Sequence, residues 1–387
     1  MSLRPLEKIR KELETPRDKR PLGSGWLSGA GAILAGLTGL LLVITLRHPG
    51  LLNTPELALL REGHYYRLAT HLVLALAYVL SLISLLLRPE KTMGFTALGL
   101  TTVAALLGGS QADAQTAAGT PLYFGLDFFI LNVLFTGFLF IPLERIWPKW
   151  GEQTVFRPEW QEDLFYYLVS SMFVQVLTFV TAAPSNFAVN ELDLNSIRGL
   201  IASQPFILQL IEIMFLTDLA QYWVHRAFHQ IPFLWRFHAV HHSAQYMDWI
   251  AGARMHFLEI IILRSLTAMP MLVLGFDPAA VQAYVLIVYV TSSFVHANVG
   301  WSFGKLERYL VTPRFHHWHH GIEREAIDVN FAIHFPILDR LFGTYHFPEG
   351  QWPRGYGIEG HPVPQGYWQQ FLYPFRRSQN KAEAEAE

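Results

Sequence analysis

The chain has 387 residues, of which 51% are hydrophobic and only 16% are charged, with a formal net charge of −2. Soluble domains usually carry about 25% charged residues, so this composition predicts a chain largely surrounded by lipid and implies no polyanionic partner. The absence of cysteine excludes disulfides, thiolate zinc sites, cysteine nucleophiles and Cys-ligated iron–sulfur clusters within the chain.

The first 24 residues are polar and rich in Lys and Arg. They contain neither an apolar run nor a small-residue cleavage site, so we expect no cleavable signal peptide. We interpret this segment as a leader before the first membrane span. Its basic residues place it in the cytoplasm by the positive-inside rule.

Apolar runs long enough to cross a bilayer, which takes about 20 residues in a helix, recur along the chain. Seven such runs are 26–46, 66–87, 123–143, 164–183, 203–224, 256–275 and 279–297. An eighth run, 93–109, is shorter and rich in Gly and Ala. We count it as a span because the segments that contain most of the Lys and Arg then lie on the cytoplasmic side. The sequence Phe276-Asp277-Pro278 predicts a tight break that joins the last two runs into a membrane hairpin.

The distribution of Lys and Arg orients these spans. Eight crossings from a cytoplasmic leader leave four further segments in the cytoplasm, namely 88–92, 144–163, 225–255 and 298–387. They contain most of the remaining basic residues, whereas 110–122 has none. The sequence therefore predicts an all-α, polytopic membrane helical bundle of about eight spans, with both termini on the cytoplasmic side.

Histidine is concentrated in the second half of the chain, where 13 of the 17 lie between residues 225 and 346. One group is a pair four residues apart, and two others have the pattern His-x-x-His-His. Because residues three and four apart lie on one face of a helix, each group is expected to direct its imidazoles toward a common point. Imidazole nitrogen is a good ligand for iron, zinc and copper.

Together these groups supply eight ring nitrogens, and His296 at the cytoplasmic end of the last span adds a ninth. All four lie at the same predicted membrane face. A single histidine pair would more often be an unrelated polar feature of a loop, but this constellation favours a two-metal centre. The predicted metal ligands are His225, His229, His238, His241, His242, His296, His316, His319 and His320.

Motifs around these histidines resemble those of one family, the fatty-acid hydroxylase/sterol desaturase superfamily of membrane di-iron enzymes. The matching segments are Asp218-x3-Tyr222-Trp-x-His-Arg, His241-His242-Ser, Arg254-Met-His-Phe-Leu-Glu259, Asp328-Val-Asn-Phe and Leu338-Asp-Arg-Leu-Phe-Gly-Thr344. The third departs from the family's "RxHPxE" pattern, since Phe257 stands where Pro is usual. The resemblance covers roughly residues 125–346.

The resemblance implies a non-haem di-iron monooxygenase that uses O2 to hydroxylate or desaturate a membrane-resident lipid or sterol-like substrate. Ether cleavage and aldehyde deformylation are related chemistries that stay open. We expect a leader with N-terminal membrane helices over 1–122, the hydroxylase-like catalytic domain over 123–375 and a frayed polar tail over 376–387.

The electrons for this chemistry are expected from outside the chain, because no flavin, nicotinamide or iron–sulfur motif is present. A ferredoxin, or a cytochrome, with its reductase is the predicted donor. It would dock on the cytoplasmic face through basic side chains such as Arg236, Arg314, Arg324 and Arg340.

Four further residues are predicted to support the ligands from outside the metal's own shell. Asp218 lies inside a span, seven residues before His225, and is expected to orient a ligand histidine by accepting its second N–H. His256 is either a ligand or such a supporting donor, or else an interfacial histidine. Glu259 and Asp328 either support ligand histidines or form plain ion pairs with nearby arginines.

His317 lies between ligand candidates but points off their helical face, so we expect it to stand apart from the metals. His334 and His346 follow the third histidine group and are interpreted as supporting or structural residues. His48, His64 and His71 lie too far along the chain, near the opposite face or early in a span.

Two other classes of function compete with an oxygenase. A histidine-lined transition-metal transporter needs polar residues along the middle of its spans, whereas here the histidines cluster at one end. A zinc-dependent membrane hydrolase would hold one metal through three protein ligands, and the sequence has no His-Glu-x-x-His motif and too many clustered histidines for such a site.

Overall fold

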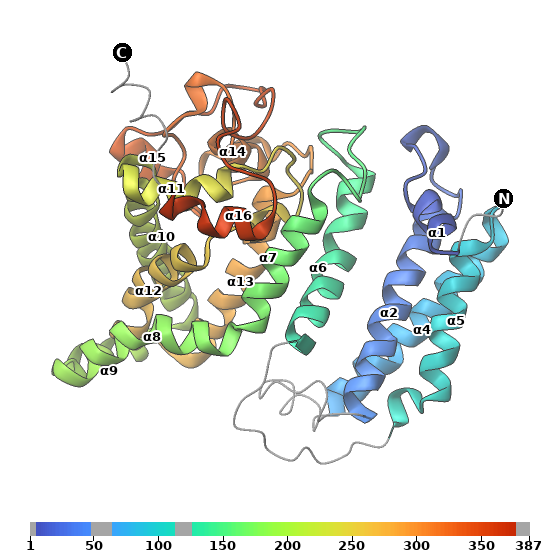
Figure 1. Cartoon of the computed structure of the whole chain (residues 1–387). Helices are drawn as coiled ribbons and strands as arrows, with labels where there is room; N and C mark the ends of the chain where they lie inside the picture. The colour runs from blue at the N-terminus through green and yellow to red at the C-terminus, as the bar shows by residue number, and fades with distance from the viewer. Residues whose placement is uncertain (1–4, 48–63, 113–125, 377–387) are drawn as a thin grey trace. The chain divides into compact units, whose positions relative to one another are not determined.

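The computed structural model describes residues 5–47, 64–112 and 126–376 (Figure 1). Within these ranges every regular element is helical, apart from two isolated β-bridges. The predicted all-α class is confirmed. Short 3-10 helices punctuate the α-helices at Arg17–Lys19, Gly109–Gln111, Ala251–Ala253, Gly304–Arg308, Arg324–Ala326 and Tyr373–Phe375. Most of the tail expected over 376–387 lies outside the described residues.

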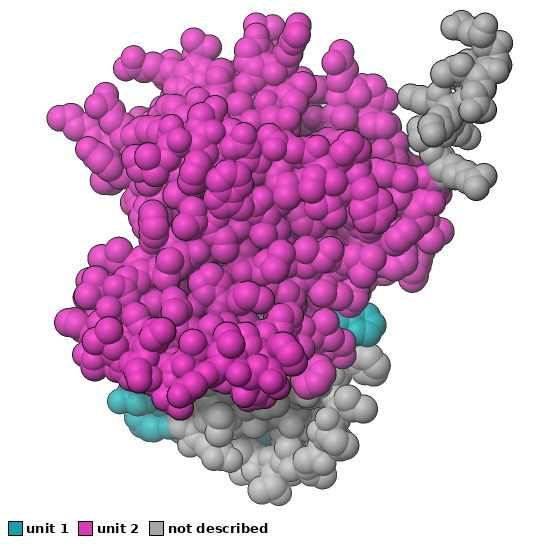
Figure 2. Space-filling view, turned by 90° about the vertical axis from the view of Figure 1, so that its left-hand side faces the viewer, with its two compact units in different colours: residues 1–157, 171–175, 298–301 teal, residues 158–170, 176–297, 302–387 magenta. Residues whose placement is uncertain are grey.

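The chain divides into two compact units, coloured separately in Figure 2. Unit 1 comprises residues 1–157, 171–175 and 298–301, and unit 2 comprises the remaining segments, 158–170, 176–297 and 302–387. The functional division predicted from the sequence, at residue 122, stays a prediction.

Unit 1 is built from close-packed helices. They are α1 (Pro5–Leu13), α2 (Trp26–Arg47), α4 (His64–Leu87), α5 (Thr92–Leu106) and α6 (Leu126–Ile146). Small residues let these helices approach one another, as is usual inside a bilayer. A Cβ added to Gly29 of α2 would lie 2.6 Å from Ser84 Oγ of α4 and 3.0 Å from Met93 Cε of α5. The Gly- and Ala-rich run 93–109 is therefore a packing surface as well as a short span.

Six helices in the described part of the chain are long and apolar enough to cross a membrane: Trp26–Arg47, His64–Leu87, Thr92–Gln111, Phe206–Gln230, Phe257–Leu274 and Pro278–His296. They correspond to six of the eight predicted spans. Helix α6 occupies most of a seventh, 123–143, whose first residues lie outside the described ranges. These helices identify an integral membrane protein, and the count of eight stays a prediction.

The predicted span 164–183 differs from a single straight helix. It is divided between α7 (Trp160–Met172) and α8 (Val174–Glu191), which form a pair bent by 59°. Hydropathy registers the length and apolarity of a segment and not the direction of its axis, so the bend had no signal in the sequence. Helix α9 (Asn195–Ala202) follows α8.

Three long helices form the frame of unit 2: α10 (Phe206–Gln230), α12 (Phe257–Leu274) and α13 (Pro278–His296). The tight break predicted between the last two is found at residues 275–277. Gly275 ends α12 with a φ of 72°, a conformation that favours glycine, and Asp277 caps α13 by accepting the Ala279 N–H at 2.8 Å. The start of α12 and the end of α13 therefore lie at the same end of the frame.

Short helices gather at that end, as Figure 1 shows: α11 (Pro232–His242), α14 (Pro313–His319), α15 (Ile337–Phe342) and α16 (Tyr367–Leu372). Helices α11 and α14 each begin with proline, whose fixed φ and missing N–H suit the first helical position. Every predicted metal ligand lies in α10, α11, α13 or α14, or directly follows α14.

Candidate metal centre

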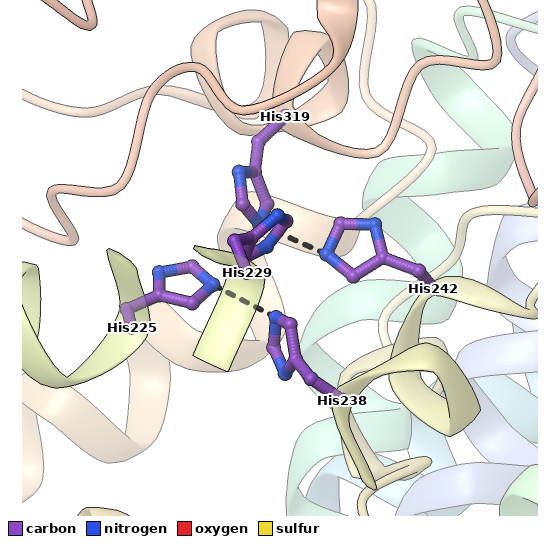
Figure 3. A group of neighbouring side chains, drawn as sticks. All are labelled: His225, His229, His238, His242 and His319. Atoms are coloured by element: carbon purple, nitrogen blue, oxygen red, sulfur yellow. Dashed lines mark hydrogen bonds between the residues drawn. The ribbon is translucent and has the colours of Figure 1, made fainter. Parts of the chain in front are cut away.

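The nine predicted ligands lie in two groups in unit 2, and in each group the candidate ligand atoms are all within 4.8 Å of one another. The five-histidine group is His225, His229, His238, His242 and His319 (Figure 3). The four-histidine group is His241, His296, His316 and His320. The structure therefore brings together all nine histidines in the predicted ligand set, and their role as ligands stays a prediction.

Each His-x-x-His-His triplet contributes to both groups, which corrects the expectation that a triplet converges on one point. In α11, His238 and His242 enter the five-histidine group, whereas His241 enters the other. Helical geometry explains the division. Residues four apart differ by about 40° around the axis, whereas neighbours differ by about 100°.

The same rule holds in α14 with the groups exchanged. His316 and His320, four apart, enter the four-histidine group, and His319 enters the five-histidine group. Each triplet therefore contributes two histidines to one group and one to the other, and the groups are exchanged between the two triplets. This arrangement suits two metal ions held side by side.

The spacing of the ring nitrogens fits bound metals. Five Nε2–Nε2 distances are His225–His238 3.0 Å, His242–His319 3.1 Å, His296–His316 3.1 Å, His316–His320 3.2 Å and His241–His296 3.4 Å. Neighbouring ligand atoms of one ion with metal–nitrogen bonds of about 2.0–2.1 Å lie roughly 3.0–3.4 Å apart.

In several of these histidines the opposite ring nitrogen donates a hydrogen bond to a backbone carbonyl. The Nδ1–H of His225 donates to Phe331 O at 3.0 Å. His241 donates to Arg254 O at 3.0 Å and His296 to Ser292 O at 2.7 Å. Since a carbonyl can only accept, Nδ1 carries the proton and Nε2 of the neutral ring presents a lone pair. His241 and His296 therefore direct lone pairs at each other, an arrangement that a cation between them stabilises.

Burial reinforces this protonation state. Removal from water lowers the pKa of six ligand candidates outside the spans well below the ordinary histidine value: His238, His241, His242, His316, His319 and His320. Neutral imidazole is the form that binds a metal. In addition, His229 Nε2 is buried and has no hydrogen-bond partner among the described residues, as expected of an atom that faces an ion.

Two of the predicted supporting carboxylates contact ligand candidates. Glu259 Oε1 accepts from His238 Nδ1 at 2.5 Å, and Asp328 Oδ1 accepts from His229 Nδ1 at 3.2 Å. The alternative ion pair between Glu259 and Arg254 is not the arrangement found, because the Arg254 guanidinium binds Asp163 and Glu159 of the 158–170 segment. A carboxylate that receives the second N–H of a ligand histidine fixes the ring and raises its basicity.

Asp218 has different partners from those predicted. Its two oxygens accept the backbone N–H groups of Ile333, His334 and Phe335 at 2.8, 3.1 and 2.7 Å. The seven-residue separation of Asp218 and His225 does place them on one face of α10. The same separation puts them about 10 Å apart along the axis, beyond the reach of a direct hydrogen bond.

His256 and His317 lie outside both groups. The ring of His256 caps α12, where Nδ1 accepts the Leu258 N–H at 3.2 Å and Nε2 donates to Phe371 O at 3.0 Å. His317 points off the ligand face as expected. Its Nδ1 accepts from the Tyr356 hydroxyl at 2.7 Å, and its Nε2 donates to His296 O at 3.2 Å.

The sequence missed the backbone carbonyls that orient the ligands. Val329 O accepts from His319 Nδ1 at 2.8 Å, and Phe331 O accepts from His225 Nδ1. Carbonyls leave no signal in residue identity. The motif Asp328-Val-Asn-Phe was the only indication that this segment lies close to the site.

Replacing Glu259 tests the carboxylate support of the five-histidine group. We expect Glu259→Ala to weaken the binding of one metal by about 10–100-fold, because His238 Nδ1–H loses its buried acceptor. Glu259→Gln keeps an oxygen acceptor and should remain within a few-fold of the parent. Chelator competition with metal analysis measures both variants, and unchanged retention in Glu259→Ala would contradict this role.

Comparison with known proteins places the site in a family. Residues 210–344 match the fatty acid hydroxylase family model. The chain is 32% identical over 180 residues to the ornithine lipid hydroxylase OlsE of Rhizobium tropici, covering 46% of this chain and 53% of that protein. It is 31% identical over 129 residues to human alkylglycerol monooxygenase, covering 33% and 28%. Methylsterol monooxygenase 1-3 of Arabidopsis thaliana is 24% identical over 231 residues, covering 55% and 76%. No solved structure matches significantly.

The matched segment contains all nine clustered histidines, from α10 to the end of α15. The predicted resemblance to the fatty-acid hydroxylase/sterol desaturase superfamily is thereby confirmed for this segment. The chain spans about half the length of the first of these relatives and less than a third of the second.

Proposed function

We propose that this protein is an O2-dependent, non-haem di-iron monooxygenase that hydroxylates or desaturates a membrane-resident lipid or sterol-like substrate. The observation that carries the proposal is the pair of adjoining histidine groups at one end of a bundle of membrane helices. The relatives support the substrate class, because their names specify an ornithine lipid, alkylglycerols and methylsterols.

The residues present fit two iron ions. The five-histidine group would hold one and the four-histidine group the other, and nitrogen ligation of this kind suits iron. Two irons bound there would supply the activation of O2. The chain's own contribution is to orient six of the nine imidazoles through carbonyl and carboxylate acceptors: those of His225, His229, His238, His241, His296 and His319. It also buries them, so that bulk water is excluded.

Helices α10 and α13, which carry ligand candidates, and their neighbour α12 are apolar enough to cross a membrane. Exposed apolar side chains continue along α10, α12 and α13, among them Ile211, Phe215, Ile262, Leu266 and Leu286. The ligands at the ends of these helices are thus expected near the bilayer surface, where a lipid can present its chain from the side. A transporter would require ligands distributed along the spans, whereas the two groups lie at one end.

Three finer statements belong to this proposal. The metal centre and both termini lie on the cytoplasmic side, and residues 123–375 form the catalytic domain. The electron donor is a separate ferredoxin or cytochrome with its reductase. Of the proposed docking residues, Arg324 and Arg340 are exposed. Arg314 is not available for docking, because it is buried and paired with Glu307.

Lipid analysis tests the reaction directly. Cells that express the chain under isotopically labelled O2 should accumulate lipids that carry one labelled oxygen atom, and cells that express His319→Ala should not. Mass spectrometry of extracted lipids measures the product. A new double bond without label would indicate desaturation. Unchanged lipids together with altered cellular metal content would favour the transporter over the oxygenase.

A further inference from the structure

The segment 328–335 receives the second N–H of three of the five histidines in one group. Asp328 Oδ1 accepts from His229, Val329 O accepts from His319 at 2.8 Å, and Phe331 O accepts from His225 at 3.0 Å. The buried Phe331 ring also packs against the same three imidazoles, with centroid distances of 5.0–5.8 Å. One short segment therefore orients most of the five-histidine group.

Two members of the four-histidine group, His241 and His296, are oriented by other elements. His241 donates to Arg254 O, which precedes α12, and His296 donates to Ser292 O within its own helix α13. Neither acceptor lies in the segment 328–335. The acceptors identified for the two groups therefore lie in separate elements, so a disturbance of this segment should affect the five-histidine group and spare the other.

The conformation of the segment depends on tethers. Asp328 and Asn330 each have a φ of 58°, in the left-handed region that Asp and Asn tolerate better than most residues. The Asn330 side chain is fixed by its Nδ2 donating to Phe315 O and His346 O and by its Oδ1 accepting the His346 N–H. The left-handed residues alternate with Val329 and Phe331, whose carbonyls face the histidines.

Two buried carboxylates hold the rest of the segment through five consecutive backbone N–H groups. Asp339 accepts from Phe331 at 2.7 Å and from Ala332 at 3.0 Å, and its Oδ1 also accepts the Thr344 hydroxyl at 2.7 Å. Asp218 accepts from the next three residues, Ile333 to Phe335. Asp339 is fully buried and grips the amide of the residue whose carbonyl orients His225.

We propose that Asp339 is a positioning residue for the five-histidine group alone: it fixes the segment 328–335, whose acceptors aim His225, His229 and His319 at one metal. The inference rests on the proposed two-metal function. It adds an asymmetry to that function, because loss of Asp339 should loosen one metal of the pair and leave the other in place.

The test measures metal retention by the purified full-length protein after it has been loaded with iron. Asp339→Ala should make one of the two metals about 10–100-fold easier to remove by a chelator, as is usual when support of a ligand histidine is lost. The second metal should dissociate as in the parent. Asp339→Asn keeps one oxygen acceptor and should give a smaller effect in the same direction, so the test survives if the alanine variant folds poorly.

Double variants identify which metal is affected. Asp339 and His225 both act on the metal of the five-histidine group, so combining Asp339→Ala with His225→Ala should leave the other metal retained, as in His225→Ala alone. Combining it with His316→Ala, in the other group, should make both metals labile, because the two lesions are independent. Equal loosening of both metals by Asp339→Ala, or loss of the other metal as well when it is combined with His225→Ala, would overturn the proposal.

Gln209→Ala provides the matched control for stability. Gln209 is buried, and its Oε1 accepts the Asp277 N–H at 2.7 Å, so it too is a side-chain tether of backbone. It lies near the start of α10, about 24 Å along the axis from His225. This variant should lower the melting temperature and leave both metals retained as in the parent.

If the parent itself binds fewer than two metals, the proposed function fails. If the parent binds two and Asp339→Ala retains both normally, only the positioning role fails.

Discussion

Replacing His316, His319 or His320 with glutamine is expected to abolish turnover, whereas His317→Gln should keep most of it. All four residues are buried in or directly after α14, so the same substitution is made in nearly the same surroundings. The first three direct a ring nitrogen into a histidine group, and His317 does not. Loss of a residue that only supports a ligand costs about 10–100-fold, so loss of a ligand should exceed 100-fold.

His317→Gln preserves the relevant contacts. The glutamine amide can donate to His296 O in place of Nε2–H, and its oxygen can accept from the Tyr356 hydroxyl. Activity should be measured with metal content and melting temperature on the same samples. Loss of turnover in His317→Gln with both metals and stability retained would contradict the separation of roles along α14.

Much of this site could be predicted from the sequence because its residues are chemically distinctive. Histidines at helical spacing indicated metal ligands, and all nine appear in the two groups. Apolar length located the frame helices, and Gly275 and Asp277 do end and begin helices where the hairpin was expected. Local spacing also placed His317 correctly, because the angle between neighbouring residues is fixed by the helix itself.

The remainder depends on tertiary contacts that residue identity does not encode. Asp218 shares a face with His225, yet its partners are backbone amides more than 100 residues later in the chain. His256 opens α12 and serves as its cap. Which of the two groups each imidazole enters depends on how α10, α11, α13 and α14 cross, and local spacing does not specify that crossing. Carbonyl acceptors such as Phe331 O are present at every residue, so only the fold selects them.

We expect the isolated protein to show no multiple turnover unless an external electron donor is supplied. Hydroxylation converts a C–H bond and O2 into a C–OH group and water, and this balance requires two electrons and two protons from elsewhere. The chain has no cysteine to ligate an iron–sulfur cluster and no recognisable flavin or nicotinamide motif. A ferredoxin or cytochrome with its reductase is therefore expected to restore turnover of protein reconstituted in lipid.

Charge reversal of the two exposed arginines distinguishes an effect on docking of the electron donor from an effect on the reaction itself. The double variant Arg324→Glu and Arg340→Glu should slow turnover driven by an acidic protein donor, most strongly at low salt, because charges beyond about 10 Å are screened at roughly 0.1 M salt. The same variant driven by a small chemical reductant should match the parent, since no protein need dock. Equal activity with the protein donor at low salt would place the docking surface elsewhere. Sustained turnover of the parent with no reductant at all would exclude a reductive oxygenase and favour redox-neutral chemistry at the same histidine groups.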